Sequence, residues 1–299
     1  MAHFEKMKGY FVEDNSIWPG HAMTIEVEEV LFEGKSPYQT VTVFKSKNMG
    51  NVLALDGIIQ LTEMDEMAYQ EPIVHIPMFA HPNPKRVLCV GGGDGGVIRE
   101  IVKHPSVEEV VICEIDQMVI DNARKYFPNI SYAYDHPKVT LFCGDAFQYI
   151  KDQKNAFDVI VSDTSDPNGG PAENLFKYPF YADLYEALKP GGKVSTQGEC
   201  FWKDMDLITN LMKDIKDNTK FESVQYASTQ IPTYPLGQIG FILCSKPLDE
   251  ANPNKEFTMR KMAREVPADM KLEFYDAEMH DAAFALPVFV KKAFAAKGL

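Results

Sequence analysis

Short runs in which apolar and polar residues alternate dominate the N-terminal part of the chain. Four such runs occur, at residues 23–32, 39–44, 51–55 and 58–61. A period of two is typical of β-strands that bury one face. Asp56-Gly57, between the last two runs, is a strong signal for a hairpin turn. The pattern predicts a small antiparallel sheet of about 60 residues, followed by a helix over residues 66–80.

From residue 85 onward, strand-like and helix-like patterns alternate along the chain. Strands are predicted at residues 86–90, 109–114, 139–143, 157–162 and 193–196, and helices at 97–104, 118–127, 179–188 and near 206–217. This alternation predicts an α/β fold in which helices cover both faces of a parallel sheet. In such folds the ligands bind at the carboxyl ends of the strands.

Two further strands, at 223–229 and 237–245, close the pattern. The second is suited to be the antiparallel seventh strand of a Rossmann-like, methyltransferase-type doubly wound sheet. Pro82 and Pro84 mark the boundary between the two patterns. We therefore expect a β-strand domain at residues 1–77, which forms part of the active-site wall, and a catalytic domain at residues 78–299.

A glycine-rich turn follows the first strand of the α/β part. Gly91, Gly93 and Gly96 satisfy the spacing of a dinucleotide-binding loop. Asp94, however, lies where a diphosphate would approach the backbone amides. A carboxylate at that position repels phosphate and attracts a cation or a sugar hydroxyl. The turn therefore indicates a nucleoside ligand that lacks phosphates and carries positive charge.

Acidic residues also follow the next three predicted strands. Glu114 lies 20 residues after Asp94, a spacing typical of an acid that binds ribose hydroxyls. Asp145, followed by Ala146, is placed to receive an adenine amino group. Asp163 and Asp166 lie three residues apart on one turn and can face each other across a small amine. Asp145 and Asp163 could instead cap the helices that follow them. The turn from Asp163 to Asp166 could instead be a flexible loop opened by an Asx-turn, or a calcium site.

Composition narrows the possible partners. The chain has 43 acidic and 30 basic residues, with a net charge of -13, which disfavours nucleic acid and favours small cations. No apolar run is long enough to span a bilayer, and the first residues lack a signal-peptide core. The histidines show no metal-ligand spacing. Buried, reduced thiols and a cytoplasmic location are expected from the cysteines in strand-like runs, Cys89, Cys113, Cys143 and Cys244.

Several motifs together resemble those of the spermidine synthases, a family of aminopropyltransferases. The resemblance covers nearly the whole chain. Its motifs are Trp18-Pro19-Gly20, Tyr38-Gln39, Leu55-Asp-Gly-Ile-Ile-Gln-Leu61, Asp65-Glu66, Tyr69-Gln70-Glu71, Gly91–Gly96, Glu114-Ile-Asp116, Gly144-Asp145-Ala146, Asp163–Pro167, Gln197-Gly-Glu199 and Ile231-Pro-Thr-Tyr-Pro235.

The resemblance implies transfer of an aminopropyl group from decarboxylated S-adenosylmethionine to putrescine, without a tightly bound cofactor or a metal. Asp163 matches the family's proton acceptor, and we place Asp166 and Tyr69 beside it as catalytic residues. The resemblance also implies a homodimer or homotetramer. The nucleoside would be held by Gln39, Gln70, Asp94, Glu114, Asp145 and Ala146, and the diamine by Trp18, Tyr69, Asp163, Asp166, Gln197 and Tyr234.

Four other functions fit parts of the pattern. A diamine N-methyltransferase would use the same scaffold with ordinary S-adenosylmethionine, and an enzyme that prefers spermidine as acceptor would need a longer pocket. A polyamine-binding protein without activity would have no need for both Asp163 and Asp166. A nicotinamide dehydrogenase is disfavoured by Asp94, for the reason given above.

Overall fold

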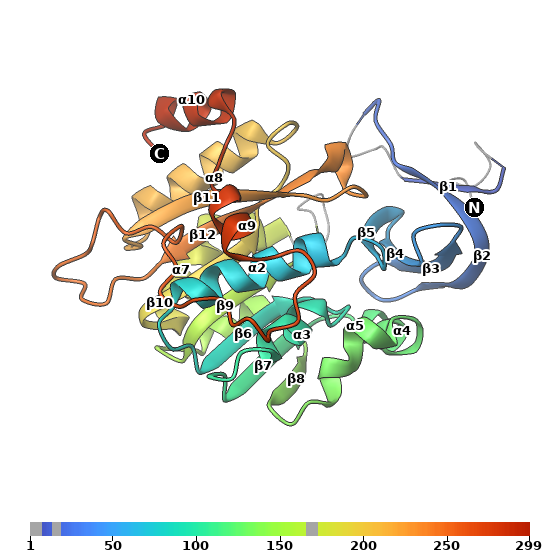
Figure 1. Cartoon of the computed structure of the whole chain (residues 1–299), viewed down its shortest axis with the longest axis horizontal. Helices are drawn as coiled ribbons and strands as arrows, with labels where there is room; N and C mark the ends of the chain where they lie inside the picture. The colour runs from blue at the N-terminus through green and yellow to red at the C-terminus, as the bar shows by residue number, and fades with distance from the viewer. Residues whose placement is uncertain (1–7, 14–18, 166–172) are drawn as a thin grey trace.

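The chain folds into two β-sheets that lie end to end and are joined by a helix (Figure 1). A computed structural model describes residues 8–13, 19–165 and 173–299. The helix is α2 (Met67–Ala80), which starts directly after the N-terminal sheet and packs on the central sheet. The expected boundary between residues 77 and 78 therefore falls within α2.

The N-terminal sheet is antiparallel, as its alternating pattern predicts. Its strands, in spatial order, are β1 (Tyr10–Val12), β2 (Thr24–Lys35), β3 (Thr40–Ser46), β4 (Asn51–Leu55) and β5 (Ile58–Thr62). The predicted hairpin joins β4 to β5 through Asp56 and Gly57, which both have positive φ, at 48° and 82°. Only β1 was not predicted, because three residues are too few to show a period.

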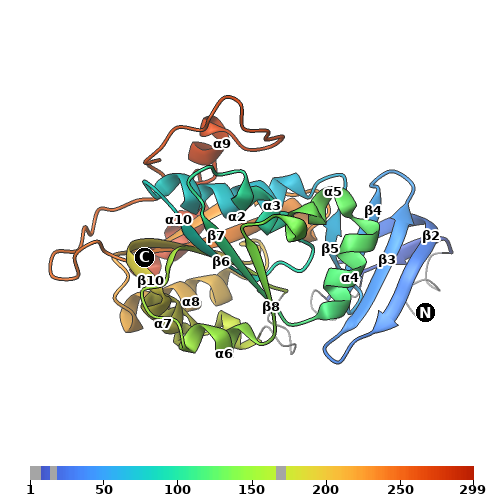
Figure 2. The ribbon, with the colours of Figure 1, turned by 90° about the horizontal axis from the view of Figure 1, so that it is seen from below.

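The N-terminal sheet does not stand alone. Val43 and Leu53 on one of its faces pack against Val119 and Phe127, which belong to the helical region that follows β7. This contact lies between α4 (Gln117–Tyr126) with α5 (Pro128–Ser131) and the sheet, as Figure 2 shows from below. The packing fixes β3, β4 and β5 beside the ends of the central strands.

The central sheet has the predicted methyltransferase-type topology. Its strand order in the described part of the chain is β11-β12-β10-β9-β6-β7-β8. All neighbours are parallel except β12, which runs antiparallel to both β10 and β11. The strands are β6 (Arg86–Gly91), β7 (Glu109–Glu114), β8 (Val139–Cys143), β9 (Phe157–Asp163), β10 (Leu188–Gln197), β11 (Ser223–Gln230) and β12 (Gln238–Ser245).

Helices cover both faces of the central sheet (Figure 2). Alternate residues of each strand supply two separate cores: Val87 and Cys89 face one layer, and Leu88 and Val90 face the other. The first layer contains α2, α3 (Gly96–Val102) and α9 (Ala277–Ala282). The second contains α6 (Ala146–Lys151), α7 (Tyr178–Ala187), α8 (Met205–Asn218) and α10 (Val288–Ala296).

One prediction about the cysteines is wrong. Cys89, Cys113 and Cys244 are buried free thiols, but Cys143 is exposed. Cys143 ends β8, which is the edge strand of the sheet and is exposed over most of its length. The apolar run at 139–143 predicts a strand correctly, but a run cannot distinguish an edge strand from a central one.

Candidate active site

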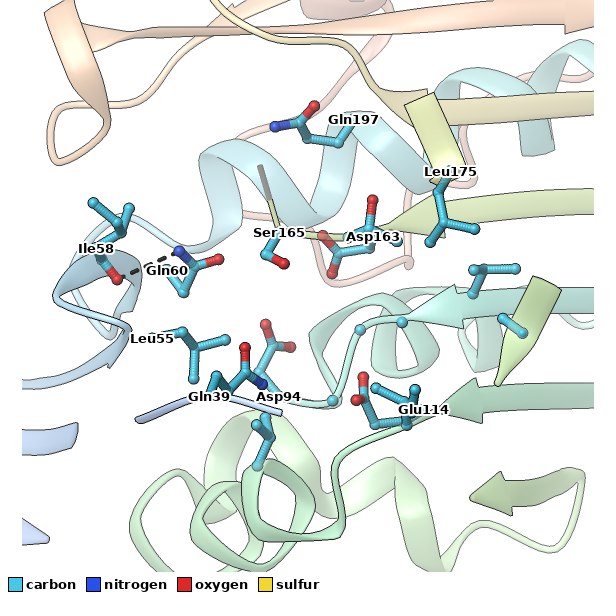
Figure 3. A pocket seen from close by; sticks show the side chains of 18 of the residues that line it. Gln39, Leu55, Ile58, Gln60, Asp94, Glu114, Asp163, Ser165, Leu175 and Gln197 are labelled. Atoms are coloured by element: carbon cyan, nitrogen blue, oxygen red, sulfur yellow. Dashed lines mark hydrogen bonds between the residues drawn. The ribbon is translucent and has the colours of Figure 1, made fainter. Parts of the chain in front are cut away.

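A cavity of about 330 Å³ lies where the N-terminal sheet meets the carboxyl ends of β6, β7 and β9. Parallel sheets place ligands at this position, beside the point where the strand order reverses. Asp94, Glu114 and Asp163 border the same opening, with Gln197 on one side and Gln39 on the other (Figure 3). Among the described residues, no Lys, Arg or His lines the cavity. The predicted convergence of unneutralised carboxylates is therefore present.

Asp163 ends β9, the strand beside β6 at the centre of the sheet. Its Oδ1 accepts a hydrogen bond of 2.7 Å from the hydroxyl of Tyr69 on α2. Burial, and after it the charge of Asp94, raises the pKa of Asp163 to about 8, although the Tyr69 bond opposes the shift. Burial raises the pKa of Tyr69 well above its ordinary value, so Tyr69 remains a neutral donor. Asp163 is therefore a carboxyl group in which burial and Asp94 favour the protonated form and the bond from Tyr69 favours the charged form.

The glycine turn contacts Asp163 through its backbone. The N–H of Gly92 donates to the carbonyl oxygen of Asp163 over 2.8 Å. Gly91 has a φ of +71°, and a Cβ there would lie 2.0 Å from the same oxygen. Glycine is required at this position by both the left-handed conformation and the close approach. The turn thus holds Asp94 and Asp163 at a fixed spacing.

Asp94 is held by two groups that do not themselves line the cavity. The N–H of Gly96 donates to Asp94 Oδ1 over 2.6 Å, and the Gln70 side-chain amide donates to both carboxylate oxygens over 3.1 and 3.2 Å. Burial raises the pKa of Asp94. Gln70 is itself buried and touches Asp94 without lining the cavity. Gln70 is expected from its motif to bind the nucleoside, and its partner in the structure is Asp94.

Glu114 ends β7 and reaches the cavity from the neighbouring strand. Burial raises the pKa of Glu114 to about 7, while a hydrogen bond from the N–H of Asp116 opposes the shift. Asp116 in turn accepts bonds from Ser36 Oγ and Gln39 Nε2, over 2.7 and 3.0 Å. Gln39 is thereby fixed at the cavity by a residue that lies between β7 and α4. Asp116 was noted only as part of a motif, and its link to Gln39 has no sequence signal.

Asp145 and Ala146 line the cavity at the start of α6. Asp145 accepts a hydrogen bond of 2.8 Å from the N–H of Phe147 and is the N-cap of this helix. The cap alternative is therefore confirmed for Asp145, and the residue borders the cavity as well. Asp163 does not cap a described helix.

Aromatic and amide side chains form another side of the cavity, next to Asp163. The rings of Tyr69 and Tyr234 lie 5.6 Å apart, and the hydroxyl of Tyr234 donates to the carbonyl oxygen of Gln60 over 2.7 Å. Gln197 donates to Glu199 over 3.2 Å. Trp18 and Asp166, which the sequence analysis assigns to the diamine, lie outside the described residues.

Some cavity residues were not assigned from the sequence. Gln60, Glu199 and Asp204 line the cavity, so it has further acidic groups on the side of Gln197. Gln60 and Glu199 belong to motifs that carry the family resemblance, so the sequence offered a signal for them. Asp204 belongs to no such motif. Within the described residues there is no cluster of three His, Cys, Asp or Glu suited to a metal ion. No helix in the described part of the chain is long and apolar enough to cross a membrane.

Two family models match the chain. The model described as spermine/spermidine synthase domain matches residues 66–255, and the one described as spermidine synthase tetramerisation domain matches residues 9–63. The junction between the matches coincides with the passage from β5 to α2. The matched segments thus correspond to the N-terminal sheet and to most of the remaining chain.

Curated relatives are similar over almost their full length. The chain is 51% identical to a spermidine synthase of Dictyostelium discoideum over 95% of this chain and 96% of the relative. It is 48% identical to a spermidine synthase of Schizosaccharomyces pombe, over 95% and 93% of the two chains.

Solved structures agree in fold as well as sequence. A spermidine synthase in complex with the transition state analogue AdoDATO has a TM-score of 0.86 and 36% identity, covering 97% of this chain and 96% of its own. The spermidine synthase from Thermotoga maritima has a TM-score of 0.84 and 36% identity, over 96% and 94%. With these matches and this cavity, the chain belongs to the spermine/spermidine synthase family of aminopropyltransferases.

Proposed function

We propose that this aminopropyltransferase of polyamine biosynthesis moves the aminopropyl group of decarboxylated S-adenosylmethionine to putrescine, with Asp163 as proton acceptor. The observation that carries the proposal is the acidic cavity, which has no Lys, Arg or His among its described lining residues. Both substrates are cations, since one has a sulfonium and an ammonium and the other has two ammonium groups. A cavity of this charge favours the pair of them over phosphate-bearing nucleotides.

The reaction is a direct displacement at carbon. The lone pair of one putrescine nitrogen forms a bond to the aminopropyl carbon that is attached to sulfur, and the bond between that carbon and sulfur breaks. The electron pair of that bond stays on sulfur, which becomes the neutral thioether of methylthioadenosine. An ammonium has no lone pair, so the attacking nitrogen must lose a proton, which Asp163 accepts.

The raised pKa of Asp163 suits this role. In the substrate-free protein a pKa of about 8 keeps the carboxyl group mostly protonated at neutral pH. The sulfonium and the ammonium groups stabilise the carboxylate when they bind, because opposite charges nearby lower the pKa of an acid. The same sulfonium lowers the pKa of the attacking amine. Proton transfer is therefore favoured only when both substrates are present.

The nucleoside side of the cavity is built for adenosine. We assign Glu114 to the ribose hydroxyls, because it ends β7 at the position where nucleoside-binding sheets carry an acid. Asp145 and Ala146 are assigned to the adenine, and Gln39 and Asp94 to the rest of the nucleoside. Gln70 would act by holding Asp94, the partner it has in the structure.

We assign the diamine to Tyr69, Gln197 and Tyr234, which line the cavity, and, from the sequence resemblance alone, to Trp18 and Asp166. The rings of Tyr69 and Tyr234 offer apolar faces to the four-carbon chain and π-faces to an ammonium, a contact worth about 0.5–2 kcal/mol. Asp166 and Gln197 would orient the amine next to Asp163. Tyr69 would serve catalysis through its bond to Asp163.

A product assay tests the proposal. The protein is supplied with decarboxylated or ordinary S-adenosylmethionine and with diamines of three to five carbons, and the products are identified by mass spectrometry. We expect spermidine and methylthioadenosine in the reaction with putrescine. A methylated diamine would contradict the proposal and support the N-methyltransferase alternative.

We further propose a homodimer or homotetramer that assembles through the N-terminal domain and acts in the cytoplasm without nucleic acid or membrane partners. The match of residues 9–63 to a tetramerisation domain supports assembly through this region. Strand β2 exposes part of its surface, including Val30, and such a surface is suited to contact with another copy. Sedimentation of the purified protein distinguishes the two assemblies.

A further inference from the structure

The buried carboxylate of Asp65 fastens a distant loop to the junction of the two domains. Asp65 lies between β5 and α2 and is 4% exposed. It accepts bonds from the N–H of Thr233 over 2.9 Å and from the Thr233 hydroxyl over 2.8 and 3.0 Å. The hydroxyl of Thr62 donates to it over 2.6 Å. Asp65 and Thr233 are 168 residues apart, so this contact is wholly tertiary.

The fastened loop, residues 231–237, carries Tyr234, which lines the diamine side of the cavity. The loop connects β11 to β12 and closes on itself through the bond from the N–H of Ile231 to the carbonyl of Gly237. Leu236 within it has a φ of +59°, a conformation that residues other than glycine rarely adopt. Two contacts from outside fasten this strained loop: Thr233 is bound by Asp65, and the Tyr234 hydroxyl donates to the carbonyl oxygen of Gln60. Such strain persists only where the surroundings enforce it.

The same short segment also places the facing tyrosine. The carbonyl of Asp65 accepts from the N–H of Ala68, and the carbonyl of Glu66 accepts from the N–H of Tyr69, so this turn begins α2. Tyr69 then reaches Asp163 through its hydroxyl. The two rings, which pack against each other with centroids 5.6 Å apart, are thus both linked to residues 65–69.

We propose that Asp65 is a positioning residue for the acceptor amine: by holding the loop at Thr233, it keeps Tyr234 packed against Tyr69 and thereby sets the shape of the diamine site. The inference rests on the proposed function for its substrate, but the contact itself does not depend on activity. The nucleoside residues Gln39, Glu114 and Asp145 lie on other elements. Loss of the contact should therefore affect the diamine more than the nucleoside, for which only Gln70 lies next to this segment.

The first test measures the contact directly. In Asp65→Ala and in Thr233→Val, we expect faster hydrogen exchange of the amides in residues 231–237 than in wild type. Thr233→Ser keeps the hydroxyl and is the matched control, with exchange close to wild type. Thr233→Val retains the backbone bond to Asp65, so it reports on the hydroxyl even if Asp65→Ala folds poorly. Unchanged exchange in both Asp65→Ala and Thr233→Val overturns the inference without reference to turnover.

The second test measures the consequence. Asp65→Ala removes the bonds from Thr62 and from both donors of Thr233 to a charged group. It should raise KM for putrescine by about tenfold, with kcat and the Kd of methylthioadenosine nearly unchanged. In a Tyr234→Ala background, Asp65→Ala should raise KM little further, because the residue through which it acts is gone. Equal losses in both backgrounds, or parallel losses of diamine and nucleoside binding, would show a general structural role. A wild-type protein that makes no spermidine would contradict the proposed function instead.

Discussion

The hydroxyl of Tyr69 donates a 2.7 Å hydrogen bond to Oδ1 of Asp163, joining α2 to the end of β9 at the centre of the cavity. The bond favours the charged form of Asp163, while burial and the neighbouring Asp94 favour the protonated form. The acidity of the proposed proton acceptor is therefore set by burial and by two named groups, Tyr69 and Asp94. Each can be changed separately, which makes the mechanism open to test.

Removal of the Tyr69 hydroxyl should move the pH dependence of turnover. In Tyr69→Phe, Asp163 loses a donor to its carboxylate, so its pKa rises further. We expect the rising limb of kcat/KM against pH to shift to higher pH. Tyr181→Phe is the matched control, since that buried tyrosine bonds Thr196 within the opposite core. An unmoved limb would mean that Asp163 does not govern this titration.

Asp163→Asn should remove most of the turnover. The amide keeps the size of the side chain but cannot take the proton of the attacking amine, and general base catalysis contributes about 10²–10⁴-fold to rate. Spermidine formation should fall by about that factor while the Kd of methylthioadenosine changes little. Near-normal turnover would remove Asp163 from the role of proton acceptor.

The same substitution should stabilise the substrate-free protein. The folded pKa of Asp163 is about 8, above that of an unfolded aspartate, so the folded state binds more protons between these values and loses stability as pH rises through the window. Asp163→Asn has no such loss. Its advantage in unfolding free energy over wild type should widen from about pH 4 to pH 8 and then stay constant.

Asp158→Asn provides a control of opposite sign. Burial favours protonation of Asp158, but hydrogen bonds from Arg86 and Lys189 outweigh it and lower its pKa. Its carboxylate therefore contributes stability above the unfolded pKa and loses it in acid. Urea unfolding at a series of pH values should show Asp158→Asn less stable than wild type at neutral pH. A difference in unfolding free energy between Asp163→Asn and wild type that does not change with pH would contradict the raised pKa of Asp163.

Glu114→Ala should weaken nucleoside binding by about 10–100-fold, because a charged acceptor for the ribose hydroxyls is lost. Calorimetry with methylthioadenosine measures the change. Glu109→Ala is the control at the other end of the same strand, where the carboxylate pairs with Arg86 outside the cavity. Equal affinity of Glu114→Ala and wild type would place the ribose elsewhere.

Most of the fold could be predicted because its strands carry their period in a few adjacent residues. The runs at 109–114 and 139–143 match β7 and β8 to the residue. The helix α6 was not predicted, because six residues are too few for a helical period. The exposure of Cys143 depends on the place of β8 at the sheet edge, which is a property of the assembled sheet.

The carboxylates of the site could be predicted because each follows a strand, and parallel strands bring their ends together. Contacts between segments that are distant in the sequence could not be predicted. The bond from Gln39 to Asp116 spans 77 residues, and that from Thr233 to Asp65 spans 168. Nothing in one sequence pairs such residues. Similarly, Gln70 was recognised by its motif, but its position behind Asp94 follows from how α2 packs.

The cavity draws its walls from Gln39 near one end of the chain to Ile239 near the other. During synthesis, the first wall leaves the ribosome long before the last one. Asp94, Glu114 and Asp163 emerge before the loop of Tyr234 and the antiparallel β12 that complete their enclosure. A nascent chain therefore cannot be helped to fold by its own substrates until about four-fifths of it has been made. Substrate binding can therefore stabilise the completed fold but not its early stages.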